Sequence, residues 1–385
     1  MMEKRVYKDS GEEISLLGFG CMRLPRRQEN SPEIDVKTAR AMIDYALEHG
    51  VNYFDTAHPY HEGLSEPFVG EALSGYPRDK FNLATKMPTW LIGDQSQVHD
   101  IFAGQLQKCR VEYVEYFDYY LVHNIGGTTF PKVEECRIYE ILKAKKREGR
   151  IRRLGFSFHA APELLRKVVS LYEWDFAQIQ LNYLDWELQD AKSQYEILTE
   201  KGIPVVVMEP VRGGALAKLC PQAIAVFRAA EPKASAASWA LRYAASLPNV
   251  LTVLSGMSAM EQIKDNVATM EDFRPLTREG YATIADALAA YRLSGTIPCT
   301  ACGYCMDCPF GVNIPKVFAI YNNYRTNNLD MLFTLEYEVL GKSGQAANCK
   351  KCGRCLPLCP QAIKIAEWME KIDQAALKAA ALPQH

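Results

Sequence analysis

The chain has 385 residues, of which 48% are hydrophobic and 23% charged, enough to bury one large core plus a small one, or two or three ordinary cores. Its formal net charge of −2 gives no electrostatic reason to expect binding to nucleic acid or to an anionic membrane. No run of apolar residues is long enough to span a bilayer and the N-terminus lacks the apolar core of an export signal, so we expect a soluble globular protein of the cytoplasm.

Eight short apolar runs occur in the first 290 residues, and most are separated by segments long enough for a crossover helix. They cover residues 16–20, 51–55, 82–86, 116–123, 151–157, 176–182, 203–209 and 250–255. Alternating strands and helices indicate a parallel sheet, and eight such units are typical of a closed barrel of about 250 residues. The alternative is a doubly wound sheet, which is disfavoured because the turn after Gly18 lacks the third glycine of a dinucleotide-binding loop. The pattern predicts an eight-stranded parallel (β/α)8 TIM barrel over residues 1–290.

Three of the predicted strands follow a helical pattern that ends in a glycine, at Gly50, Gly149 and Gly202. Glycine is favoured there because the residue after the last helical turn often adopts positive φ. Upstream of the first, Ala39, Met42, Ile43 and Ala46 have the spacing of one helix face.

Polar side chains close several of the predicted strands, and these ends share one mouth in a barrel of this kind. Asp55, Lys86 and His123 stand at three strand ends, and Tyr60 follows Asp55 by five residues. Taken singly, the aspartate could cap a helix, the lysine could be a solvated charge, and the histidine could belong to the core. Together they provide proton delivery, because an ammonium favours phenolate and a histidine can orient a carbonyl.

These residues resemble the catalytic motifs of the aldo-keto reductases. The likeness is carried by Asp55-Thr56-Ala57-His58-Pro59-Tyr60, by Ala84-Thr85-Lys86 and by Tyr120-Leu121-Val122-His123, and it extends over about residues 5–285. It implies that Tyr60 is the general acid, that Lys86 and Asp55 tune it, and that His123 orients a small carbonyl substrate. A nicotinamide cofactor, NADPH or NADH, would supply the hydride.

The same resemblance implies the cofactor contacts. Ser157 and Gln178 match the positions that hold the nicotinamide carboxamide, although Phe158 stands where an asparagine is usual. The segment 209–216, with Arg212 and Gly214, resembles the loop that covers the pyrophosphate. Ser258, Gln262 and Asn266 resemble the segment that holds the adenosine half, and neutral Gln262 leaves the choice between NADH and NADPH open.

Eight of the twelve cysteines fall in two quartets between residues 299 and 359. The quartets are Cys299, Cys302, Cys305 and Cys308, and Cys349, Cys352, Cys355 and Cys359, each followed by proline. The second has the spacing of bacterial ferredoxins, whose fourth cysteine ligates the other cluster of a pair. We therefore predict one [4Fe-4S] cluster on Cys299, Cys302, Cys305 and Cys359 and another on Cys349, Cys352, Cys355 and Cys308. Zinc is the alternative, disfavoured because zinc ribbons place two cysteine pairs on either side of a longer loop.

Apolar residues at helical spacing follow both quartets, at 314–321 and 365–372, and predict a small, mainly helical ferredoxin-like domain over 291–385. Barrel and cluster domain together resemble the iron-sulfur branch of the aldo-keto reductases. The first functional hypothesis is an NAD(P)H-dependent carbonyl reductase that carries two [4Fe-4S] clusters. The alternatives are an electron-transfer protein that links nicotinamide to a ferredoxin or other redox protein, and a non-enzymatic module that senses cofactor or oxidants.

Overall fold

The structure is a computed structural model that describes residues 1–8, 10–28, 31–110, 116–306 and 308–381. It divides into two compact units, one formed by residues 1–210 and 238–276, the other by 211–237 and 277–385. No helix among the described residues has the length and apolar character needed to cross a membrane.

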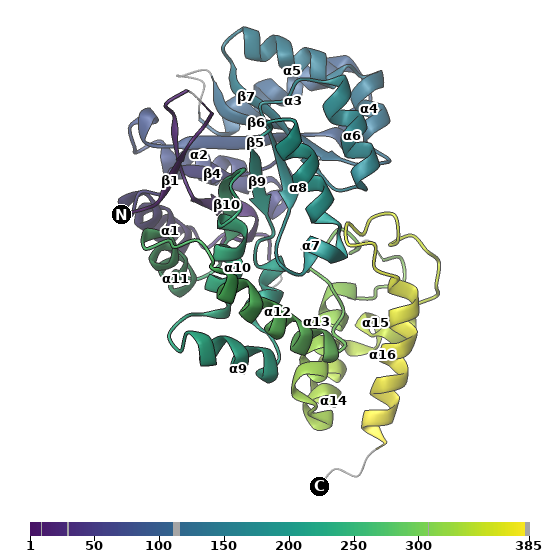
Figure 1. Cartoon of the computed structure of the whole chain (residues 1–385). Helices are drawn as coiled ribbons and strands as arrows, with labels where there is room; N and C mark the ends of the chain where they lie inside the picture. The colour runs from purple at the N-terminus through teal and green to yellow at the C-terminus, as the bar shows by residue number, and fades with distance from the viewer. Residues whose placement is uncertain (9, 29–30, 111–115, 307, 382–385) are drawn as a thin grey trace. The chain divides into compact units, whose positions relative to one another are not determined.

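The first unit contains a closed barrel of eight parallel strands, which confirms the predicted fold (Figure 1). Every one of the eight apolar runs forms a strand, because each is buried on both sides. The strands are β3 (Leu17–Gly20), β4 (Tyr53–Asp55), β5 (Asn82–Pro88), β6 (Phe117–Ile125), β7 (Ile151–Phe158), β8 (Phe176–Gln180), β9 (Val205–Met208) and β10 (Val250–Gly256). The barrel closes between β10 and β3.

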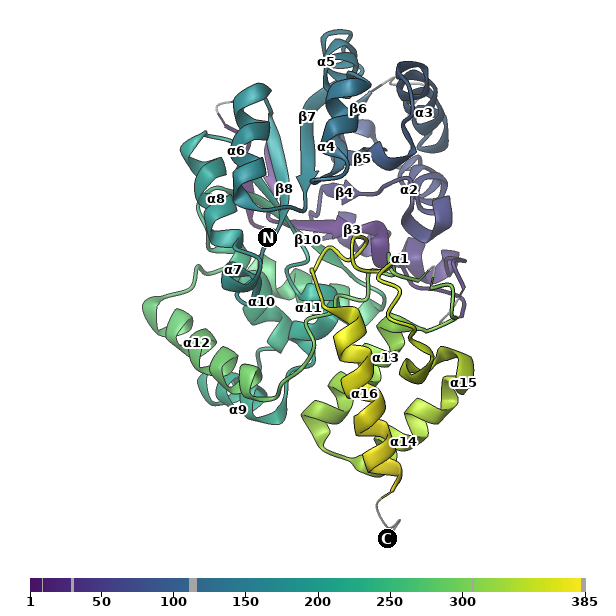
Figure 2. The same ribbon diagram turned by 90° about the vertical axis from the view of Figure 1, so that its right-hand side faces the viewer.

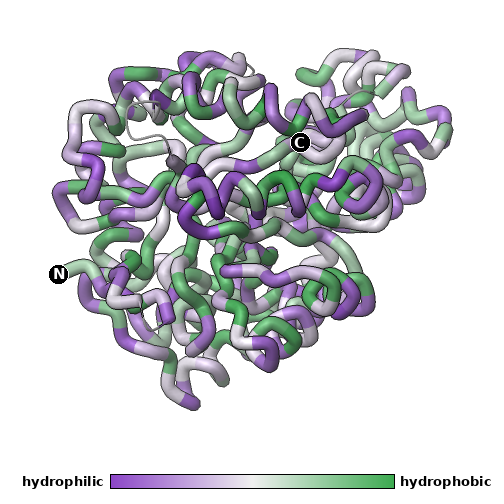
Figure 3. Tube along the Cα trace, turned by 90° about the horizontal axis from the view of Figure 1, so that it is seen from above, coloured by the Kyte–Doolittle hydropathy of each residue, from purple (hydrophilic) through white to green (hydrophobic). Residues whose placement is uncertain are grey.

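Amphipathic helices alternate with the strands, and hydrophobic and hydrophilic residues alternate along them (Figure 3). The predicted face of α1, with Ala39, Met42, Ile43 and Ala46, is fully buried. Gly50, Gly149 and Gly202 have positive φ, as predicted for the helix ends that precede β4, β7 and β9. The helices up to β10 are α1 (Val36–Glu48), α2 (Ser65–Leu73), α3 (Gln95–Lys108), α4 (Phe130–Glu135), α5 (Ile138–Arg147), α6 (Pro162–Leu171), α7 (Asp185–Leu188), α8 (Ala191–Glu200), α9 (Pro221–Ala230) and α10 (Ala236–Ala245); α11 (Met260–Glu271) follows β10.

A short antiparallel hairpin, β1 (Lys4–Val6) and β2 (Glu13–Ser15), precedes the barrel and was not predicted. Tyr7 and Ile14 join a buried cluster with Tyr53 and Phe176, the first residues of β4 and β8. The hairpin therefore closes the N-terminal end of the barrel, opposite the strand ends that carry the polar side chains.

The second unit is mainly helical. It contains α9, α12 (Arg278–Leu293), α13 (Ile314–Asn327), α14 (Asp330–Val339), α15 (Gly341–Gly344) and α16 (Ile365–Ala380), of which α13, α14 and α16 pack side by side (Figure 2). The predicted apolar positions Ile314, Val317, Ile365 and Met369 are buried in one cluster. Residues 211–237 belong to this unit because α9 packs against α12.

The contact between α2 and α3 gives a direct test of the barrel packing. A Cβ on Gly70 in α2 would lie 2.4 to 2.6 Å from backbone atoms of Cys109, and that backbone cannot rotate away. We expect Gly70→Ala to lower the free energy of unfolding by about 1–3 kcal/mol or more.

Gly104→Ala in α3 is the matched control, because a Cβ there meets nothing within 4 Å. A helical glycine replaced by alanine gains roughly 0.5–1 kcal/mol. Urea unfolding followed by circular dichroism measures both, and a Gly70→Ala protein as stable as the parent contradicts the packing described.

Candidate active site and cysteine centres

The four residues predicted from the strand ends meet at the C-terminal end of the barrel. Lys86 is fully buried in β5, and its Nζ lies 2.7 and 2.8 Å from the two carboxylate oxygens of Asp55. The same nitrogen lies 2.9 Å from the Thr56 carbonyl oxygen and 3.2 Å from Oη of Tyr60. The register makes this possible, because Asp55 at the end of β4 pairs with Ala84, two residues before Lys86.

Tyr60 begins the short helix η2 (Tyr60–Gly63) and keeps its proton at neutral pH. Burial raises the pKa of its phenol well above the usual value, and the carboxylates of Asp55 and Glu209 act in the same direction. Sequence reasoning considered only the ammonium of Lys86, which donates a hydrogen bond to the phenol oxygen and favours phenolate. The phenol is thus a protonated group with a cation placed where negative charge would develop on proton loss.

His123 in β6 presents a neutral imidazole beside this phenol. Burial lowers its pKa well below the usual value, and Lys86, His159 and His58 add to the effect. Its ring lies edge-on to the Tyr60 ring, with centroids 6.4 Å apart, and its Nδ1 has no hydrogen-bond partner among the described residues. A phenol and a neutral imidazole side by side can both bind one oxygen atom that gains negative charge.

Sequence reasoning missed Arg23 and Trp90, and it placed Glu209 at a strand end without its effect on Tyr60. Arg23 and Glu209 form an ion pair of 3.0 Å, and the two charges shift the Tyr60 pKa in opposite directions. Trp90, in η4 (Thr89–Leu91), places its ring edge-on to His123 at 5.0 Å between centroids. Trp90 could have been found from its position just after a predicted strand end, where mouth-lining residues occur.

Three further histidines, His58, His61 and His159, differ in their environments. The pKa of His159 is lowered to about 4 by burial and by Lys86, and burial also lowers that of His58. His61 is buried, with its Nδ1 3.1 Å from the Pro32 carbonyl oxygen. Burial lowers the pKa of His61 as well, so all three imidazoles favour the neutral form.

Ser157 and Gln178 lie directly opposite each other on β7 and β8 and are both buried. Ser157 Oγ accepts a hydrogen bond of 2.8 Å from the Asn124 backbone. Gln178 Oε1 is buried and has no partner among the described residues. A buried amide oxygen without a donor fits a ligand that carries an N–H group, such as a carboxamide.

Ser258, Gln262 and Asn266 follow β10. The Ser258 backbone donates to Gln262 Oε1 at 2.7 Å, and Asn266 Nδ2 donates to Ser255 Oγ at 2.9 Å. Ser258 and Gln262 thus meet at the start of α11 (Met260–Glu271), whereas Asn266 lies farther along the helix and contacts the end of β10.

Arg212 and Gly214 lie in η5 (Arg212–Ala217) of the second unit. Gly214 has a φ of 93°, which suits glycine. Arg212 is 1% exposed, and its guanidinium donates a hydrogen bond of 2.8 Å to Oε1 of Gln361, two residues after Cys359. The predicted pyrophosphate ligand therefore contacts the turn that follows the second quartet.

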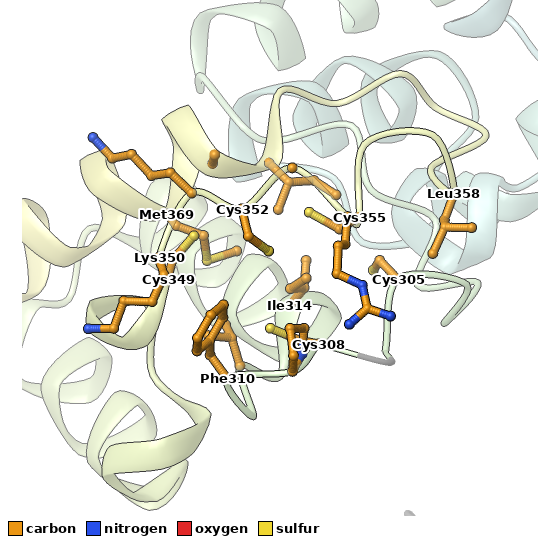
Figure 4. Close-up of a pocket in the computed structure, with 17 residues that line it drawn as sticks. Cys305, Cys308, Phe310, Ile314, Cys349, Lys350, Cys352, Cys355, Leu358 and Met369 are labelled. Atoms are coloured by element: carbon orange, nitrogen blue, oxygen red, sulfur yellow. The ribbon is translucent and has the colours of Figure 1, made fainter.

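One group of cysteines lines a cavity of about 120 Å³ in the second unit. Five cysteines, Cys305, Cys308, Cys349, Cys352 and Cys355, line this space (Figure 4). Two come from the first quartet and three from the second, so the cavity gathers the four residues of the predicted mixed set together with Cys305, which is predicted for the other set.

The other cysteines of the two quartets form a second group, to which Cys305 also belongs. Burial raises the pKa of Cys299 to about 11 and that of Cys305 to about 12, and the nearby thiols of Cys302 and Cys359 add to both. Here Cys359 is the residue that comes from the other quartet. Among the described residues, no three His, Cys, Asp or Glu side chains converge closely enough to hold a single metal ion. A cubane does not need such convergence, because its cysteines bind different irons.

Comparison with known proteins identifies both parts of the chain. Residues 16–289 match the model described as the Aldo/keto reductase family, and residues 298–363 match that of a 4Fe-4S dicluster domain.

Relatives and solved structures agree with the first match. The chain is 32% identical over 215 residues to "Probable aldo-keto reductase 1" of Glycine max, covering 53% of this chain and 58% of that protein. It is 27% identical over 305 residues to "Uncharacterized oxidoreductase YqkF" of Bacillus subtilis, covering 72% and 94%. The structure of aldo-keto reductase AKR11C1 from Bacillus halodurans in its holo form is similar with a TM-score of 0.61 and 28% identity, covering 74% of this chain and 96% of that one.

The charges around Tyr60 predict opposite effects for two substitutions. Glu209→Gln removes a carboxylate that raises the Tyr60 pKa, so the phenol should lose its proton at a lower pH. Arg23→Gln removes a cation that lowers this pKa, so the phenol should keep its proton to a higher pH. NMR titration of ring-labelled tyrosine, with the signal assigned by Tyr60→Phe, measures both. Shifts of the same sign in the two variants contradict this electrostatic account.

Proposed function

Because the chain belongs to the aldo/keto reductase family and carries a C-terminal 4Fe-4S dicluster domain, we propose that it is an NAD(P)H-dependent reductase of aldehydes or ketones. The observation that carries the proposal is the position of Tyr60 Oη, 3.2 Å from the buried Lys86 ammonium. We further propose that the barrel domain spans 1–290 and the cluster domain 291–385, in keeping with the matched ranges.

The proposed reaction adds one hydride and one proton across a carbonyl group. A bound dihydronicotinamide supplies the hydride that reaches the carbonyl carbon. Tyr60 gives its proton to the carbonyl oxygen as the C=O π bond breaks, and the product is the alcohol. Lys86 stabilises the phenolate that remains, and Asp55 stabilises the ammonium in turn. His123, being neutral, donates a hydrogen bond to the same carbonyl oxygen and orients it.

The proposed cofactor is NADPH or NADH. Ser157 and the unpartnered oxygen of Gln178 would hold the nicotinamide carboxamide. Gly214 and Arg212 would lie by the pyrophosphate, and Ser258, Gln262 and Asn266 by the adenosine half. Because Gln262 is neutral, it offers no charge to a 2'-phosphate, and both cofactors remain in the proposal.

We also propose two [4Fe-4S] clusters on the two mixed cysteine sets. The support is the spacing of the quartets and the presence of Cys308 at one cavity with Cys349, Cys352 and Cys355, where Cys305 also lies. Such clustered thiols suit a reducing compartment, which favours the cytoplasm.

A second candidate function is electron transfer between nicotinamide and a ferredoxin or other redox protein. The exposure of Cys352 favours it, because a cluster held there would lie close to the surface. The two functions predict different effects of removing the hydroxyl group of Tyr60.

Tyr60→Phe should lower kcat for carbonyl reduction by about 100-fold or more, because it removes the proton donor. The dissociation constant for NADPH, measured by fluorescence, should not change. Tyr53→Phe is the control. It deletes a buried hydroxyl that has no partner among the described residues, in the buried cluster that Tyr7 and Ile14 of the N-terminal hairpin join. This change should leave kcat unchanged. If the Tyr60→Phe protein reduces carbonyls as fast as the parent, Tyr60 is not the acid. If both proteins turn over only with a viologen, and at equal rates, the second candidate function is favoured.

The cysteine assignment predicts which cluster each substitution removes. Cys308→Ala should give the EPR spectrum of Cys352→Ala, because both residues are assigned to the second cluster. Cys359→Ala should likewise give the EPR spectrum of Cys302→Ala, because both residues are assigned to the first cluster. Iron and acid-labile sulfide per chain should fall by about half in each variant, since one cluster of two is lost. If Cys308→Ala instead matches Cys302→Ala, each quartet holds its own cluster.

A further inference from the structure

The cavity that brings Cys308 to the second quartet is lined by cations. Lys350, Lys351 and Arg354 line it, and its described lining residues include no aspartate or glutamate (Figure 4). We call these three residues the cationic rim. The whole chain carries a formal net charge of −2, so the rim is a local excess of positive charge on a slightly acidic protein.

The cationic rim is open to solvent and largely uncompensated. All three of its residues are exposed, as is Cys352 between them. Lys351 pairs with Glu370 at 2.9 Å, whereas Lys350 and Arg354 form no ion pair with the described residues.

Exposed apolar side chains lie beside the cations. Phe310 and Leu358, which also line the cavity, are 40% and 47% exposed, and neighbouring Leu356 is 44% exposed. Exposed apolar groups next to unpaired charges are typical of a surface that another protein covers.

We propose that the cationic rim and these apolar residues form the docking surface for a small acidic one-electron carrier protein. This rests on the proposed second cluster, and it goes beyond it by assigning the partner's charge and its place of contact. Complementary charge brings such a carrier to the cluster, and the apolar residues exclude water once the two proteins meet.

The electron step is a simple exchange. The reduced carrier loses one electron, the oxidised cluster gains one, and no proton or bond is transferred. A carrier of single electrons suits a cluster, which changes its charge by one electron at a time. Cys352 is the exposed cysteine of the set, so a cluster held by it would lie near the surface that the carrier would cover.

Another role for the rim is to offset the negative charge of the cluster itself. That role would change the rate of electron transfer from every donor to the same extent, because it alters the cluster and not the binding of the donor. A docking role acts only on donors whose charge the rim attracts, so the charge of the donor separates the two.

The experiment compares the rates at which two reduced donors deliver electrons to the holoprotein, by stopped flow at low ionic strength. The donors are a purified acidic [2Fe-2S] ferredoxin and the methyl viologen radical cation. In Lys350→Glu/Arg354→Glu the second-order rate constant with ferredoxin should fall about tenfold or more and lose its dependence on salt. The rate with methyl viologen should stay the same or rise, since the donor is itself a cation.

The control is Lys233→Glu/Lys378→Glu, which makes the same change in net charge with two exposed lysines outside the cavity lining. Lys378 lies thirteen residues along α16 from Ile365, or about 20 Å at the helical rise. This control should react with ferredoxin at nearly the parent rate. If charge reversal prevents cluster assembly, Lys350→Gln/Arg354→Gln serves in its place, with a smaller fall expected.

Three results overturn the proposal. They are an unchanged ferredoxin rate in the rim variants, an equal fall with ferredoxin and methyl viologen, and an equal fall in the control. Iron content and EPR spectra recorded first separate this from the proposed function: a parent protein without the second cluster refutes the cluster assignment, whereas an intact cluster with a charge-independent rate refutes only the docking surface.

Discussion

The active-site geometry depends on one buried ammonium. Lys86 has no exposure to solvent, and a charge in that position is costly unless it is paired and hydrogen-bonded. Asp55 and the Thr56 carbonyl provide those partners, and both come from the end of β4. The position of Tyr60 follows from this, because the phenol comes four residues after Thr56 and completes the set of acceptors around Nζ. The aspartate thus holds the lysine, and the lysine defines where the phenol of Tyr60 lies.

The sequence could predict this group of side chains because a parallel barrel places the C-terminal ends of all its strands at the same end. Once the apolar runs were assigned to strands, Asp55, Lys86 and His123 had to converge, and no long-range contact needed to be known. The Arg23–Glu209 pair is different. These residues are 186 positions apart and meet because β10 closes the barrel between β9 and β3, so their effect on the Tyr60 pKa depends on closure geometry. The hairpin of β1 and β2 was missed because strands of three residues carry almost no periodicity.

In the second unit, the cysteine spacing carried more information than the helical pattern. The ferredoxin motif predicts that Cys308 joins the second quartet, and Cys308 lines one cavity with Cys349, Cys352 and Cys355, although Cys305 of the other predicted set lines it too. The sequence did not predict α14, whose described residues between Asp330 and Val339 include exposed Met331, Leu335 and Val339 alongside buried Phe333 and Tyr337. Because apolar residues occupy both of its faces, the helix has no single apolar stripe to detect. The helix is stabilised instead by packing against α13 and α16.

Within the second unit, Arg212 is the predicted contact of the cofactor pyrophosphate and also lies near the first cysteine group. The resemblance assigns it to an anionic phosphate, yet the structure buries it against Gln361. Burial raises the pKa of the Cys299 thiol, and the charge of Arg212 partly opposes that rise. A guanidinium favours thiolate for the same reason that it favours phosphate, since both are anions. If Cys299 holds a cluster as proposed, this buried cation would favour its reduced state, because a cluster becomes more negative when it accepts an electron. Arg212 therefore cannot be understood as a cofactor ligand alone: any change in its charge or position alters the surroundings of the first cysteine group as well as the loop after β9.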